Sequence, residues 1–197
     1  MENLYLVVGL GNPGKGYERT RHNAGFLAVD RLVRRWRLEW TADAVFDSRR
    51  ARVDRDGRRV LMVQPQTFMN RSGDAVGRYV AYYRVALERL LVVVDDADLD
   101  LGTVRLRPRG SSGGHHGLES IERQLGTREY GRLRIGIGRR SEGPREITNH
   151  VLGRFERSEW PWFERVLDRV ADQIECWLEA GMGVAMNRYN GVVAQTE

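Results

Sequence analysis

The chain is poor in cysteine, the residue that builds disulfide-linked and zinc-bound domains. It has one cysteine, Cys176, among 197 residues, so it forms no internal disulfide and contains no paired-cysteine zinc motif. A chain of this length can bury a sizeable core without such cross-links. Cys176 lies beside Trp177 in a helical apolar pattern, and we expect it to be a small core residue. A single thiol is compatible with a reducing compartment.

Long apolar runs are also missing. No run approaches the roughly 20 residues that a membrane-spanning helix needs. The first residues, "MENLYLVVGLGNPG", lack the basic segment and the small-residue cleavage site of a secretory signal. We therefore expect a cytoplasmic protein that does not associate with a membrane.

Lysine is nearly absent, although the chain is basic. Of the 32 basic residues only Lys15 is a lysine, and the formal net charge is +5. The planar arginine fork matches the geometry of phosphate, but a GC-rich genome produces the same bias. The positive excess favours a polyanionic partner without distinguishing RNA from DNA.

The order of apolar patterns predicts one α/β domain over residues 1–197, with a mixed twisted sheet and helices on both faces. Helical spacing predicts helices at about residues 24–37, 73–84 and 157–181, and a short helix in "GLESIERQLG". "DRDG" marks a hairpin turn between the predicted strands "AVFDSRRARV" and "RRVLMVQP". The other predicted strands are "LYLVVGLG", "LLVVVDD", "TVRLRPR" and "RLRIGIG".

Four polar segments stand at the ends of predicted strands or lead into predicted helices. They are "GYERTRHNAGF" (16–26), "QPQTFMNRSG" (64–73), "VVVDDADLDLG" (92–102) and "RGSSGGHHGLES" (109–120). In open α/β sheets, ligands bind beyond the carboxyl ends of the strands. We therefore expect the four segments to converge on one site that contains His22, with a strand-end carboxylate to orient it.

The residue types in these segments favour hydrolysis by activated water. An imidazole with a pKa near ~6.5 can take a proton from water at neutral pH. A carboxylate on its other nitrogen would fix the tautomer and stabilise the imidazolium ion. Asn12 and Asn70 offer amides that can bind an ester or amide. Ser111 and Ser112 lack the nucleophile-elbow pattern, so direct attack by water is favoured.

Two other interpretations of these segments remain open. "VGLGNPG" contains the G-x-G-x-x-G pattern of dinucleotide sites, but Pro13 and "KGYERTRHN" separate it from the helix, and Asp30 lies within that helix. The acidic cluster "DDADLD" suggests a metal site, yet it lacks the glycine and the terminal glutamate of a calcium loop.

Taken in order, six segments resemble the bacterial peptidyl-tRNA hydrolase family over nearly the whole chain. They are "VVGLGNPGKGYERTRHNAGF", "QPQTFMNRSG", "VDDADLDLGTVRLRPRGSSGGHHGL", "LRIGIGR", "HVLGRF" and "AMNRYNG". The resemblance implies a monomeric α/β enzyme without metal, cofactor or obligate protein partner. Such an enzyme binds the CCA end and acceptor stem of peptidyl-tRNA and cleaves the ester between peptide and tRNA, which recycles the tRNA.

The resemblance also implies roles for individual residues. His22 would be the general base for water, and Asp95 would hold it in its basic form. Asn12 would sense the peptide and reject an unblocked aminoacyl group. The other positions that the resemblance assigns to the substrate or its tRNA are Tyr17, Phe68, Met69, Asn70, Arg105, Arg107, Arg134 and His116.

One departure from the family pattern concerns the substrate contact. The family usually reads Gly-Gly-His-Asn-Gly where this chain reads "GGHHG", so His116 replaces an amide. We expect His116 to lie near His22, and two imidazolium ions there would repel and lower both pKa values, which would weaken the base at acid pH. We expect His115 to be a structural hydrogen-bonding residue. Because of this departure, a second function stays open: an RNA-binding protein on the same scaffold that does not catalyse the reaction.

Overall fold

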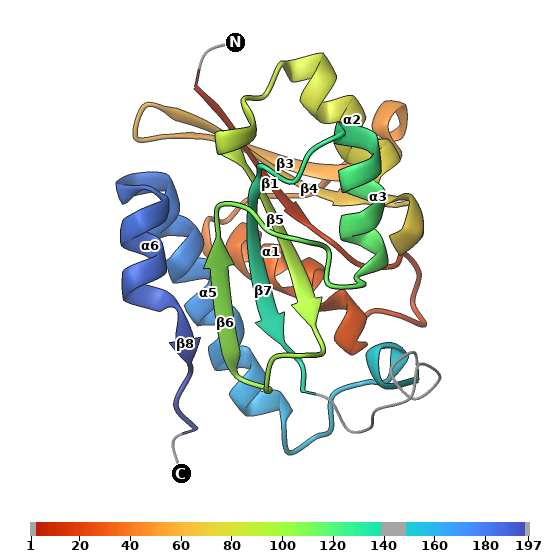
Figure 1. Ribbon diagram of the computed structural model, residues 1–197, viewed down its shortest axis with the longest axis vertical. Helices are drawn as coiled ribbons and strands as arrows, with labels where there is room; N and C mark the ends of the chain where they lie inside the picture. The colour runs from red at the N-terminus through yellow and green to blue at the C-terminus, as the bar shows by residue number, and fades with distance from the viewer. Residues whose placement is uncertain (1–2, 139–148, 196–197) are drawn as a thin grey trace.

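The computed structural model describes residues 3–138 and 149–195, and one eight-stranded sheet runs through it in the order β2-β3-β4-β1-β5-β7-β6-β8 (Figure 1). The strands are β1 (Leu4–Gly9), β2 (Thr41–Asp43), β3 (Ser48–Arg55), β4 (Arg58–Pro65), β5 (Leu90–Asp96), β6 (Thr103–Arg107), β7 (Gly131–Gly136) and β8 (Gly191–Val192). The four central strands, β4, β1, β5 and β7, are mutually parallel, and antiparallel strands flank them. The predicted mixed sheet is therefore confirmed.

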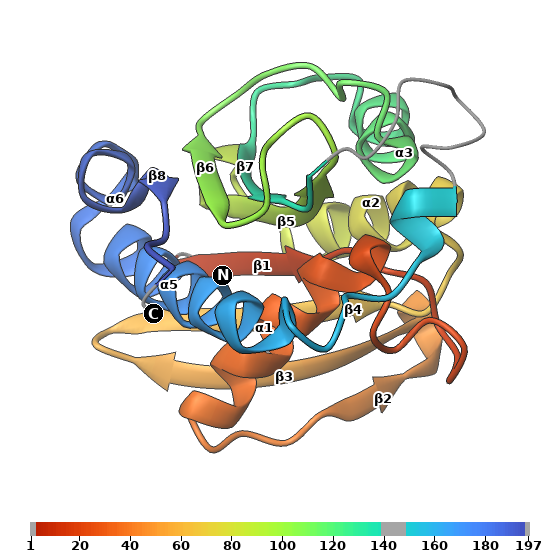
Figure 2. The same cartoon turned by 90° about the horizontal axis from the view of Figure 1, so that it is seen from below.

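Helices cover both faces of the sheet, as predicted. They are α1 (Ala24–Arg35), α2 (Ser72–Tyr83), α3 (His116–Leu125), α5 (Trp160–Ala180) and α6 (Met182–Tyr189). Figure 2 shows α2 and α3 on one face and α1 and α5 on the other. Strand β5 is buried at every residue because both of its faces are covered. Within the described residues, no helix combines the length and the hydropathy needed to cross a bilayer.

The first turn of α1 packs against the carboxyl end of β1 and the middle of β5. A Cβ atom at Gly25 would lie 2.2 Å from the carbonyl oxygen of Val93 and 2.6 Å from the backbone nitrogen of Leu10. Only a residue without a side chain allows this approach. It brings the 3₁₀ turn that precedes α1, Arg21–Asn23, to the carboxyl end of the sheet.

Three short elements escaped the sequence patterns, and one predicted strand starts later than expected. Strands β2 and β8 have three and two residues, too few to show a period. Helix α6 begins directly after Gly181, which has a φ of 85°. The segment Ala44–Phe46 forms a 3₁₀ turn in place of the expected strand, because Phe46 turns inward and stacks on Tyr79 with their ring centroids 4.4 Å apart.

Candidate active site

A cavity of about 540 Å³ lies at the carboxyl ends of the central strands. Each of the four predicted polar segments contributes to its wall, so the segments converge as expected. The lining includes His22 and Asn12 from the region after β1, Phe68, Met69 and Asn70 from the region after β4, the residues 95–98 from β5 onward, and the residues 113–116 before and at the start of α3.

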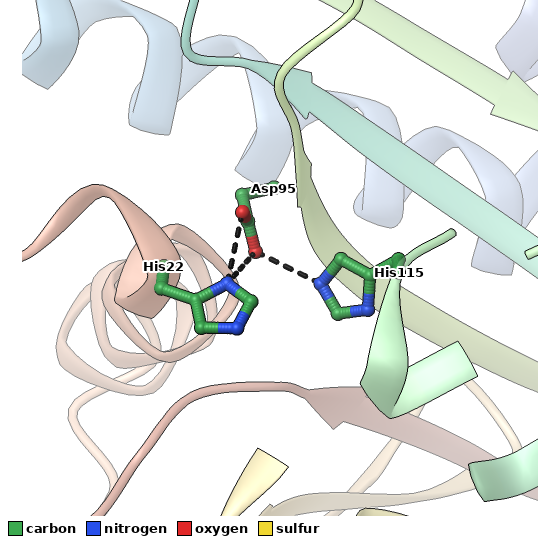
Figure 3. A group of neighbouring side chains, drawn as sticks. All are labelled: His22, Asp95 and His115. Atoms are coloured by element: carbon green, nitrogen blue, oxygen red, sulfur yellow. Dashed lines mark hydrogen bonds and ion pairs between the residues drawn. The ribbon is translucent and has the colours of Figure 1, made fainter. Parts of the chain in front are cut away.

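The imidazole of His22 and the carboxylate of Asp95 are hydrogen-bonded inside this cavity (Figure 3). His22 Nδ1 lies 3.0 Å from both carboxylate oxygens. A carboxylate only accepts, so Nδ1 carries the proton and donates it. The other ring nitrogen, Nε2, is then unprotonated in the neutral ring and available as a base. The distance is within the range expected for the assigned pair, roughly 2.6 to 3.2 Å.

A second histidine, His115, shares the same carboxylate. Its Nε2 lies 3.0 Å from Asp95 Oδ1, and its Nδ1 accepts hydrogen bonds from the backbone N–H groups of Gly117 and Leu118 at 3.1 and 3.3 Å. Nδ1 must therefore be unprotonated, which places the proton of the neutral ring on Nε2, from where it is donated to Asp95. His115 caps the N-terminus of α3 and holds Asp95, which is the structural role expected for it.

The environment of the pair favours the charged forms of both partners. Burial lowers the pKa of the His22 imidazole, but the charge of Asp95 and its hydrogen bond outweigh burial and raise the pKa above its ordinary value of 6.5. Burial opposes ionisation of Asp95 too, yet His22 and His115 hold the pKa of this carboxyl well below its usual range. Asp95 is therefore ionised at neutral pH and can stabilise an imidazolium ion at His22.

The cluster of His22, Asp95 and His115 also has the proximity of a metal site, since one ligand atom from each lies within 4.8 Å of the others. A metal ion on Nε2 of His115 would move the ring proton to Nδ1, against the two backbone N–H groups that point at it. The donor pattern thus fits a hydrogen-bonded cluster better than a metal centre. In the acidic cluster, Asp96 is engaged by the Arg134 guanidinium at 3.0 Å and the Asp98 backbone N–H at 2.9 Å.

Asn12 is fixed in the cavity wall by a reciprocal pair of hydrogen bonds. Its backbone N–H donates to Asn23 Oδ1 at 2.8 Å, and Asn23 Nδ2 donates to the Asn12 carbonyl at 3.0 Å. The Asn12 side-chain oxygen accepts from the backbone N–H of Met69 at 2.8 Å. Sequence reasoning missed Asn23, and its position directly after His22 was the only signal of its role.

Comparison with known proteins identifies the family. The family model described as peptidyl-tRNA hydrolase matches residues 6–197. The chain belongs to the peptidyl-tRNA hydrolase family. It is 44% identical over 187 residues to the peptidyl-tRNA hydrolase of Gloeobacter violaceus, which covers 95% of this chain and 94% of that protein. It is 41% identical over 188 residues to the peptidyl-tRNA hydrolase of Thermoanaerobacter sp., covering 95% and 100%.

Solved structures of peptidyl-tRNA hydrolases share the fold over the same length. The enzyme from Acinetobacter baumannii matches with a TM-score of 0.91 and 34% identity, covering 98% of this chain and 97% of that chain. A peptidyl-tRNA hydrolase in complex with n-propanol matches with a TM-score of 0.92 and 33% identity, covering 99% and 98%.

The residue that departs from the peptidyl-tRNA hydrolase pattern does not lie where we expected. The His116 side chain is 74% exposed, and its Nδ1 contacts Glu119 Oε2 at 3.2 Å. The imidazole next to His22 is that of His115, with the ring centroids 5.2 Å apart. The expected lowering of the His22 pKa is therefore not found, since Asp95 leaves this pKa raised. His116 does line the cavity, so its substrate contact stays a prediction.

The other positions that the sequence resemblance predicts to contact substrate differ in exposure. Phe68 is 59% exposed at the cavity, which excludes a core role for it, whereas Met69 is buried in the wall. Asn70 is exposed and lines the cavity. Tyr17 is half-buried in the turn before His22 and lies outside the cavity wall.

The three predicted phosphate-binding arginines divide into two kinds. Arg134 is buried, and its guanidinium donates to Asp96 at 3.0 Å and to the Ser111 carbonyl at 2.7 Å. This geometry favours positioning of the loop before α3 over contact with phosphate. The Arg105 side chain is 43% exposed, and its contact with Asp96 is loose, at 3.7 Å. Arg107 is exposed. These two remain candidates for the nucleic-acid contact.

Proposed function

We propose that this chain hydrolyses the ester bond that joins a peptide to the 3′ end of tRNA, with water as the nucleophile and His22 as its general base. The observation that carries the proposal is the hydrogen bond of 3.0 Å between His22 Nδ1 and Asp95, which leaves Nε2 of the imidazole as the basic atom in a cavity of about 540 Å³. Membership of the peptidyl-tRNA hydrolase family supports the same reaction.

The reaction balances with this chain's residues alone. His22 Nε2 accepts a proton from water while the water oxygen bonds to the ester carbonyl carbon, and Asp95 stabilises the resulting imidazolium ion. The tetrahedral intermediate collapses by breaking the bond to the 3′ oxygen, and the imidazolium returns its proton to that oxygen. The products are the free peptide acid and tRNA with a free 3′ hydroxyl. Asn12 is suited to bind the acyl group, because it lines the cavity and the backbone N–H of Met69 occupies its side-chain oxygen, which leaves its NH₂ group to donate to a ligand.

The substrate's tRNA would enter through its CCA end. Phe68 offers an exposed aromatic surface for base stacking, and Asn70 offers an amide beside it. Arg105 and Arg107 would contact the phosphates of the acceptor stem. One copy of the chain supplies His22, Asp95 and His115, so we propose a monomer as the active form. A tRNA substrate and a single reduced thiol fit a cytoplasmic protein.

The test is single-turnover cleavage of N-acetyl-aminoacyl-tRNA by wild type and by His22→Ala. Removal of a general base should lower the rate by about two to four orders of magnitude, while binding of the same tRNA persists. A variant that keeps a near-native rate would show that His22 is not the base. A wild-type protein that binds tRNA and cleaves no ester would instead support an RNA-binding protein on this scaffold.

A further inference from the structure

A second cavity, of about 580 Å³, adjoins the active site. Asn12 lines both cavities, and Asn23, which fixes Asn12, lines the second. The remaining wall comes from the segment 13–19, from α1, from the ends of β3 and β4, and from Trp160 at the start of α5. Helices α1 and α5 cover the same face of the sheet (Figure 2), and Arg49 of β3 reaches Asp30 of α1 on that face.

The wall of this second cavity carries a positive excess. Its charged residues are Lys15, Arg19, Arg34, Arg49, Glu18 and Asp30. Asp30 is satisfied internally: it accepts from the Arg49 guanidinium at 3.2 Å and from Trp40 Nε1 at 2.8 Å. Arg49 and Asp30 therefore cancel, and three cations stand against Glu18 alone, which leaves a net charge of +2.

The three remaining cations are available to a ligand. Lys15, Arg19 and Arg34 form no ion pair with any residue that the structure describes. Arg19 instead lies over the ring of Trp160, 5.0 Å from its centroid, so the cavity also offers a flat apolar wall. Such a mixture of apolar surface and unpaired cations suits an extended chain that carries carboxylate groups.

The position of the cavity indicates which part of the substrate reaches it. Arg105 pairs directly with Arg134 between β6 and β7, so both side chains share one face of the sheet. Arg134 reaches the loop before α3, which makes this the face of α2 and α3. The second cavity lies on the opposite face, with His22 at the strand ends between them. A tRNA bound at Arg105 and Arg107 would therefore reach the ester from the first face, and the second cavity lies on the other side of His22.

We propose that the second cavity binds the peptide residues that precede the esterified one, and that it prefers acidic side chains there. The inference rests on the proposed function, since it assigns the peptide part of that same substrate. Lys15 and Arg34 carry the preference because both are cations without a described ion-pair partner, and Arg19 and Trp160 form the surface along which the peptide lies.

The test compares two peptidyl-tRNAs that differ only in the residue before the esterified one, glutamate in one and lysine in the other. Wild type should cleave the glutamate substrate with a kcat/KM about two- to fivefold higher, the effect of an exposed charge pair. The double variant Lys15→Glu, Arg34→Glu should reverse the preference, and high salt should abolish it in wild type. Arg84→Glu is the matched control: Arg84 also stands at the end of a helix, α2, and lines neither cavity.

Any other outcome contradicts the proposal that the second cavity is a peptide subsite. If the double variant lowered kcat/KM for both substrates by the same factor, the cavity would hold an RNA phosphate and not the peptide. An unchanged ratio, or a reversal in Arg84→Glu as well, would also overturn the proposal while leaving hydrolysis intact. If wild type cleaved neither substrate, the proposed function itself would fall, and the subsite with it.

Discussion

At the scale of single residues, hydrogen-bond surroundings separate two histidines that share one acceptor. His22 and His115 both direct a ring proton at Asp95. The second nitrogen of His115 is held by two backbone N–H groups, whereas no described residue is hydrogen-bonded to that of His22, which lines the cavity. Only His22 can therefore take up a proton without losing an existing hydrogen bond. The ring nitrogen that faces away from Asp95 therefore decides the role: it is free to accept a proton in His22, and it accepts backbone hydrogen bonds in His115.

The pH dependence of catalysis should follow from the raised pKa of His22. The base works unprotonated, so kcat/KM should rise with pH through the His22 pKa, with a midpoint above 6.5, and then level off. Asp95→Asn removes the charge that raises this pKa, so the midpoint should move to lower pH while the plateau falls. The measurement is kcat/KM against pH for both proteins. A wild-type midpoint below 6.5, or one that Asp95→Asn leaves in place, would contradict the assignment.

His116 should affect substrate binding and leave the base alone. Its side chain is exposed and contacts Glu119, so His116→Asn should change KM by up to about tenfold, the value of one hydrogen bond. The midpoint of the pH profile should stay within error of wild type. Steady-state kinetics at several pH values separate the two effects, and a shifted midpoint would mean that His116 acts on the base as well.

At the scale of elements, the contact between α1 and the sheet sets the position of the base. Gly25→Ala would place a methyl group 2.2 Å from the Val93 carbonyl oxygen, which forces α1 and its preceding turn to shift. We expect the free energy of unfolding to fall by about 1–3 kcal/mol, as for overpacked cores, with a loss of activity. Urea unfolding measures the change in the free energy of unfolding. Gly16→Ala is the control, because a Cβ there meets nothing within 4 Å.

Sequence periodicity predicted the long helices and strands because they bury one face or both. It failed for β2 and β8, which are too short for an apolar pattern to repeat. The positions of the strand ends likewise predicted that His22 and Asp95 meet, since His22 follows the parallel strand β1 and Asp95 lies at the end of the parallel strand β5. They did not reveal Asn23 or the capping nitrogen of His115, because those roles depend on hydrogen-bond directions that exist only in the folded chain. The same holds for Arg134, whose guanidinium donates to the carbonyls of Ser111 and Ser112, contacts that the sequence does not show.

At the scale of the whole molecule, the positive charge should make substrate capture depend on salt. Arg105 and Arg107 lie on one strand and are at least partly exposed. Each arginine that contacts a phosphate releases a counterion, so Arg105→Gln or Arg107→Gln should reduce the slope of log affinity against log salt by about one. Filter binding of tRNA across a salt series measures the slope. Arg84→Gln should leave it unchanged, and an unaltered slope in the first two variants would place the tRNA elsewhere.

The ion pair between Arg21 and Glu159 has a consequence for the order of synthesis. Arg21, the neighbour of His22, is buried, contacts Glu159 of the segment before α5 at 2.6 Å, and donates to the Ile137 carbonyl at 3.3 Å. The turn that carries the base is thus fastened by residues made more than a hundred positions later. During synthesis, His22 leaves the ribosome well before Ile137 and Glu159, the residues that hold its turn in place. The nascent chain should therefore not hydrolyse peptidyl-tRNA until α5 has left the exit tunnel.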